Sequence, residues 1–98
     1  MLETIHIEYH IAGQTCLKTL EATLEDRISG VSDLIRNENE DFLDGICSDD
    51  LQLWWITPNQ TALPYRTTAL RDMFPAGDTS AGYLWVHVPL WFHARNGK

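Results

Sequence analysis

Basic residues and long apolar runs are scarce in this sequence, and each shortage excludes a class of function. Lysine and arginine together number 7 against 14 aspartates and glutamates, so the formal net charge is −7. Such a surface repels nucleic-acid phosphate and anionic lipid, so we expect no direct binding to nucleic acid or membrane. No apolar run approaches the roughly 18 residues that a membrane-spanning helix needs. Electrostatics favours a basic protein as the partner.

Cysteine is equally rare, and its placement is uninformative. Cys16 and Cys47 have neither metal-ligand spacing nor a C-x-x-C pairing. We expect two buried thiols, with one disulfide in an oxidising compartment as the alternative. The first residues carry no basic region of the kind that opens a conventional signal peptide.

Catalytic and cofactor motifs are missing as well. The sequence contains no glycine-rich phosphate loop, no nucleophile elbow and no cysteine–histidine–acid constellation, so we expect neither an enzyme nor a cofactor. His6 and His10 share one face of a predicted strand but lie about 13 Å apart there, too far to hold one metal ion. The carboxylates between residues 38 and 50 lack the calcium-loop pattern and predict a solvated loop. The final Asn-Gly-Lys lacks the Gly-Gly end of a conjugated modifier, so we expect no covalent tagging.

The most informative stretch that is present covers residues 50–59. It is a short aliphatic and aromatic run entered from two aspartates and closed by Pro-Asn, which is typical of a buried strand. Alternation puts Leu51, Leu53 and Trp55 on one face and the side chains of Gln52, Trp54 and Ile56 on the other. Two adjacent tryptophans cannot both enter one core, so one of them is exposed or covered by a second layer.

The remaining patterns predict the order of elements. Residues 4–11 alternate as a half-buried strand, a turn at Ala12-Gly13 follows, and residues 14–22 return as a second strand with a bulge or an edge position near Lys18. Residues 23–26 resemble a helix start, and an apolar stripe continues to about residues 37–39. After the tryptophan strand we expect a very short strand at 63–66, a helical turn near 70–74 capped by Thr67 or Thr68, and a last strand at 83–88.

This order predicts a single α+β domain of the ubiquitin-like, β-grasp kind. The mixed sheet would have four to five strands, with the first and last strands parallel at its centre and one main helix on one face. The domain covers residues 1–92, and residues 93–98 are a tail or a truncated linker. A single helix leaves the other face of the sheet open. Alternation places five side chains there as a partner-binding surface: His6, Gln52, Trp54, Trp85 and His87. The alternatives are a reversed parity, or residues 90–92 folding back over this face.

Three segments carry a narrower resemblance. Residues 30–35, Gly-Val-Ser-Asp-Leu-Ile, are similar to the Val-x-x-Leu helix of the N-terminal ubiquitin-like domain of Crinkler effectors from oomycetes and fungi. Residues 41–54 resemble that family's acid-rich loop and Leu-x-Leu-Trp strand, and residues 85–89 its closing His-Val-x-Val strand. The chain departs from the family where the helix lacks lysines and the strand reads Leu-Trp-Trp-Ile.

The resemblance implies a non-catalytic leader module that delivers a downstream effector domain, secreted or moved into a host cell. It would make Leu51, Leu53 and Trp54 the delivery-motif strand. Alternation indicates that Leu51 and Leu53 face the core, so their replacement would abolish delivery by unfolding the domain. The alternative function is a stand-alone acidic ubiquitin-like adaptor or inhibitor that binds a basic protein.

Overall fold

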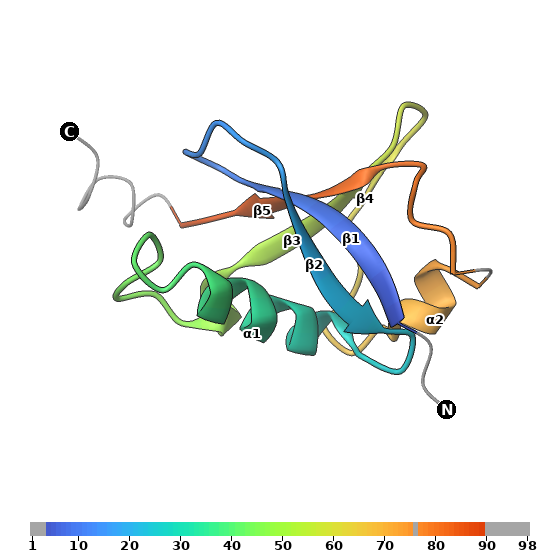
Figure 1. Cartoon of the computed structure of the whole chain (residues 1–98), viewed down its shortest axis with the longest axis horizontal. Helices are drawn as coiled ribbons and strands as arrows, with labels where there is room; N and C mark the ends of the chain where they lie inside the picture. The colour runs from blue at the N-terminus through green and yellow to red at the C-terminus, as the bar shows by residue number, and fades with distance from the viewer. Residues whose placement is uncertain (1–3, 76, 90–98) are drawn as a thin grey trace.

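The structure, a computed structural model, describes residues 4–75 and 77–89. Over these residues the chain forms one five-stranded sheet with its main helix on one side (Figure 1). The elements in chain order are β1 (Thr4–Ile11), β2 (Lys18–Thr23), α1 (Ile28–Glu38), η1 (Ser48–Asp50), β3 (Gln52–Ile56), β4 (Thr61–Ala62), α2 (Leu70–Met73) and β5 (Tyr83–His87). This confirms the predicted α+β arrangement.

The sheet is mixed, with the strand order β2-β1-β5-β3-β4. Its first and last strands run parallel at the centre, where Tyr9 pairs with Leu84 and Ile11 with Val86. The other neighbouring strands are antiparallel. The predicted grasp, in which both ends of the domain meet in the middle of the sheet, is therefore confirmed.

The hairpin between β1 and β2 is wider than predicted. Gly13 has a φ of 98°, and the amide of Gln14 donates to the Ile11 carbonyl at 3.0 Å, so the chain turns there. The return strand begins only at Lys18, and the predicted start at residue 14 is wrong. The predicted edge position is confirmed, because β2 ends the sheet on this side.

Helix α1 begins at Ile28, after the start signal predicted at residues 23–26. Asp26 Oδ2 accepts a hydrogen bond from the Thr23 amide at 2.8 Å, and the Asp26 amide donates to the Thr23 carbonyl at 3.0 Å. These bonds make residues 23–26 a turn, because Asp and Thr stabilise turns and helix starts by similar side-chain bonds. The predicted stripe holds, since Ile28, Val31 and Ile35 are buried.

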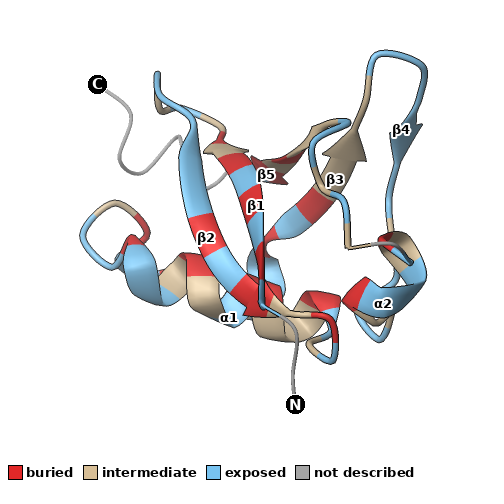
Figure 2. Cartoon of the chain, turned by 45° about the vertical axis from the view of Figure 1, so that its right-hand side comes forward, coloured by how far each residue is buried: buried red, intermediate tan, exposed pale blue. Residues whose placement is uncertain are grey.

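The core lies between α1 and the inner face of the sheet. Figure 2 shows buried and exposed positions alternating along β1 and β2, as a sheet covered on one side requires. Leu51 and Leu53 are buried, so the prediction that they face the core is confirmed. Trp55 points to the same side and meets the Phe74 ring edge-on, with centroids 4.8 Å apart.

The connection from β3 to β5 departs from prediction in two places. The short strand is Thr61–Ala62, which pairs with Ile56 and Trp55, so the strand predicted at residues 63–66 is wrong. Neither Thr67 nor Thr68 caps α2, whose cap residue is Ala69 without a side-chain bond. The backbone supplies the bonds instead, because the Leu70 amide donates to the Asp26 carbonyl at 2.8 Å.

The cysteine prediction is also wrong. Cys16 and Cys47 are both exposed and free, since each lies in a connecting loop and not in an element that faces the core. The predictions for the apolar run at residues 90–92 and the tail at 93–98 lie outside the described residues.

Candidate functional site: the open face of the sheet

The described helices leave one face of the sheet uncovered, and we call it the open face. Helix α1 packs against β2 and β3 from the inner side, and α2 contributes Leu70 to the same core. Outward side chains of β1, β5 and β3 occupy the opposite side. Its residues are His6, Glu8 and His10 from β1, Thr19 and Glu21 from β2, Tyr83, Trp85 and His87 from β5, and Gln52, Trp54 and Ile56 from β3.

Three of these side chains form an aromatic row across the three central strands. Trp54 on β3 is directly opposite Trp85 on β5, and Trp85 is in turn opposite His10 on β1. The rings of His10 and Trp85 stack with centroids 4.9 Å apart and an interplanar angle of 29°. All three residues are only partly buried, so each presents ring surface to a partner.

The β3–β5 register also places one residue pair on each side of the aromatic row. Ile56 pairs with Tyr83 on one side, and both are partly buried. Gln52 pairs with His87 on the other, and both are exposed. The open face therefore has an apolar and aromatic centre with a polar border, which is the layout of protein interfaces.

His6 stands apart from the row. Its Nε2 lies 3.3 Å from a carboxylate oxygen of Glu21 on β2, and both side chains are well exposed. Its carbonyl accepts a hydrogen bond from the Thr79 hydroxyl, so the loop before β5 runs beside this part of β1. Of the five side chains predicted for the surface, the structure brings Gln52, Trp54, Trp85 and His87 together and leaves His6 at the β2 side.

The sequence prediction omitted three residues of the open face centre. Alternation already turned His10 and Ile56 outward, but only the β1–β5 register places His10 against Trp85. That register joins strands from opposite ends of the chain and leaves no local signal in the sequence. Tyr83 could have been included on the alternation of Leu84, Trp85 and Val86 alone.

The acidic segment after α1 offers no comparable site. Glu40 lies 4.0 Å from Arg36, and Asp49 pairs with Arg66 at 2.6 Å, so part of the negative charge is compensated locally. Across residues 4–75 and 77–89, no three His, Cys, Asp or Glu side chains are grouped as metal ligands. Among the helices described, none has the length and apolar character to cross a membrane.

Comparison with known proteins identifies the fold. The solution structure of the C-terminal ubiquitin-like domain of mouse tubulin-specific chaperone e matches 90% of this chain and 89% of its own, with a TM-score of 0.67 and 10% sequence identity. The fold is ubiquitin-like. No family model matches the sequence, and no curated protein matches it either. The ubiquitin-like fold of this chain thus carries the aromatic row on the side of the sheet that α1 leaves free.

Proposed function

We propose that this chain is a non-catalytic protein-interaction module that binds a partner through the open face. The observation that carries the proposal is the row of Trp54, Trp85 and His10, partly exposed in register on three adjacent strands. Exposed tryptophans cost solubility and are enriched among the residues that dominate binding energy at interfaces. The core of the described residues is formed without this row, so packing within the domain does not explain it.

The charge of the chain narrows the partner's chemistry. The net charge is −7, and Glu8 and Glu21 stand on the open face beside the row. A basic protein surface with an apolar centre complements this arrangement, because opposite charges steer the encounter and aromatic contacts hold the complex. Nucleic acid and anionic membranes are disfavoured for the same reason.

The Crinkler resemblance supports a more specific version, in which this module leads a longer effector. In that version the protein is secreted or enters a host cell, and a downstream domain acts there. Of the delivery-motif strand, Leu51 and Leu53 are buried at 3% and 2% exposure, while Trp54 lies on the open face. Only Trp54 is therefore available to a delivery receptor without unfolding the domain.

Binding and unfolding can be separated by four single variants. Trp54→Ala and Trp85→Ala should lower the melting temperature much less than a core truncation does, yet weaken binding to a partner captured by the wild-type domain by roughly tenfold or more. Leu53→Ala should lose binding and melting temperature together. Tyr65→Ala removes an aromatic side chain that is 82% exposed outside the open face, and it should change neither. Unchanged capture by both tryptophan variants would refute the proposal.

A stand-alone adaptor or inhibitor is the alternative, favoured by the acidic net charge alone. The two versions differ in what the module carries. Fusion of the domain to a reporter tests delivery: uptake of the reporter by host cells that is lost in Trp54→Ala supports the leader module. Partner binding without uptake supports the adaptor.

A further inference from the structure

Among the described residues, β2 forms one outer edge of the sheet, away from the aromatic row. The two edges of the sheet differ in length, since β4 at one edge has only two residues and β2 at the other has six. An unpaired edge of this length can template a further strand, and proteins usually protect such edges with lysine, proline or a covering segment. The one basic residue of β2 is Lys18, and its ammonium group donates a hydrogen bond to Asn39 Oδ1 instead of guarding the edge.

The backbone groups on this edge can be assigned from the turn at its end. The Thr23 amide donates to Asp26 Oδ2, and the Thr23 carbonyl accepts from the Asp26 amide, so both groups point away from β1. In an antiparallel ladder the residues alternate between facing the neighbouring strand and facing away. Glu21 and Thr19 therefore direct their amides and carbonyls to the free edge, where a partner strand can pair with them.

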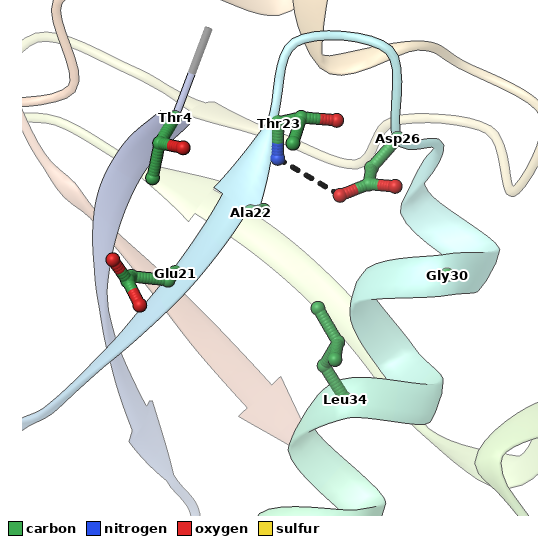
Figure 3. A pocket seen from close by; sticks show the side chains of 7 residues that line it. All are labelled: Thr4, Glu21, Ala22, Thr23, Asp26, Gly30 and Leu34. Atoms are coloured by element: carbon green, nitrogen blue, oxygen red, sulfur yellow. Dashed lines mark hydrogen bonds between the residues drawn. The ribbon is translucent and has the colours of Figure 1, made fainter. Parts of the chain in front are cut away.

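A groove lies between this edge and α1. It has a volume of about 390 Å³, and Ala22 and Leu34 give it an apolar lining (Figure 3). In that view Leu34 rises from α1 toward β2, and the hydrogen bond between Thr23 and Asp26 closes one end. Side chains on the inner side of an added strand would enter this groove.

Gly30 leaves the helix side of the groove open. Its φ is not positive, and a Cβ built on it would meet no atom within 4 Å, so neither backbone conformation nor crowding requires glycine there. Glycine inside a helix costs about 1 kcal/mol relative to alanine. A small residue at this position therefore keeps the space beside Leu34 free for a side chain of an added strand.

Side chains of an added strand would alternate between the groove and the outer face, and each side defines which residue types fit there. Residues facing inward would contact Ala22 and Leu34, and residues facing outward would lie beside Glu21, whose side chain is 69% exposed. The two charged residues that line the groove, Glu21 and Asp26, are both acidic. We propose that this edge binds an extended peptide in which aliphatic residues alternate with lysine or arginine, adding one strand to the sheet.

The test uses two synthetic peptides of five residues, lysine alternating with valine and glutamate alternating with valine, titrated into the full chain with ¹⁵N labelling. The lysine peptide should shift the amide signals of Thr19, Glu21, Gly30 and Leu34, and the glutamate peptide should bind about tenfold more weakly. Glu21→Pro removes an edge donor that β1 does not use, and Gly30→Leu fills the groove. Both variants should lose binding, whereas Glu21→Gln should keep the edge pairing and Gly30→Ala should leave the groove open.

Several results would overturn the proposal. Absence of shifts with both peptides, equal affinity for the two, or unchanged binding by Gly30→Leu would each do so. Trp54→Ala must still bind the lysine peptide, because a loss would place the peptide on the open face instead. Shifts at β2 that depend on protein concentration without peptide would show that a second copy of the chain occupies this edge.

Discussion

Asn39 donates a hydrogen bond from Nδ2 to the Tyr9 hydroxyl at 3.1 Å, joining the end of α1 to the middle of the sheet. Both residues are almost fully buried, with 5% and 1% of their surface exposed. The same amide nitrogen donates to the Ile35 carbonyl at 2.8 Å, and the Tyr9 hydroxyl donates to Glu38 Oε1 at 2.9 Å. This network fixes where α1 ends above β1, because a shift of the helix would leave buried polar groups unpaired.

Alkaline pH should destabilise the fold through Tyr9. Burial, and to a lesser degree the bond to the Glu38 carboxylate, raises the pKa of this phenol, although the bond from Asn39 lowers it. The unfolded chain then loses its tyrosine proton first, so the free energy of unfolding should fall as pH rises above about 10. Urea titrations between pH 8 and 11 measure this. Tyr9→Phe should flatten the decline, and an equal decline in that variant would assign the effect to other groups.

Asn39→Ala should lower the free energy of unfolding by about 2 kcal/mol, since it removes three side-chain hydrogen bonds: those to Tyr9 and Ile35 and the one from Lys18. Asn37→Ala, an exposed asparagine two residues earlier, is the matched control and should change stability by less than about 0.5 kcal/mol. Chemical denaturation of the two variants measures the difference. Equal values would mean that the network contributes nothing specific.

Truncation of two adjacent residues of β3 should cost very different amounts of stability. Leu53→Ala leaves a cavity in the core and should cost about 2–5 kcal/mol. Trp54→Ala removes a partly exposed ring from the open face and should cost about 1 kcal/mol, through its contact with the opposite Trp85. Thermal denaturation followed by circular dichroism measures both. A larger loss for Trp54→Ala would place that ring in the core.

Gly30→Ala should stabilise the domain by about 1 kcal/mol, because the added methyl group meets open space and alanine favours helix. Denaturant midpoints at matched slopes would show the gain. A loss of stability would mean that the groove beside Gly30 is narrower than the structure has it.

Gly82→Ala should act in the opposite direction. A Cβ at this position would lie 2.1 Å from the Ile56 carbonyl oxygen, and that oxygen belongs to backbone next to the start of β5. The strands would have to separate, at a cost of about 2 kcal/mol or more. Amide exchange should quicken at Ile56 and Tyr83 first, and unchanged exchange there would contradict the predicted clash.

Local sequence patterns correctly predicted the features that depend on a single helix or strand. The spacing of Ile28, Val31 and Ile35 predicted the helix, and the alternation around Leu53 predicted which tryptophan faces outward. The predictions failed where one sequence pattern fits two local structures. Residues 23–26 could begin a helix or close a turn, and only the bonds of Asp26 to Thr23 distinguish them.

The composition of the two sites could be predicted only in part. The open face followed from alternation, but the contact of His10 with Trp85 depends on the non-local pairing of β1 with β5. The groove at β2 could not be inferred at all, because it requires the position of α1 relative to an edge strand. From the sequence, Gly30 could be interpreted only as a residue that destabilises the helix; the space beside it required the structure.

Because Tyr9 of β1 pairs with Leu84 of β5, the sheet cannot be completed until β5 has been synthesised. Until β5 has left the ribosome, no strand joins the hairpin of β1 and β2 to β3 within the sheet. A nascent chain would expose core side chains until β5 is available, so a premature stop anywhere before β5 should yield a product cleared by proteases.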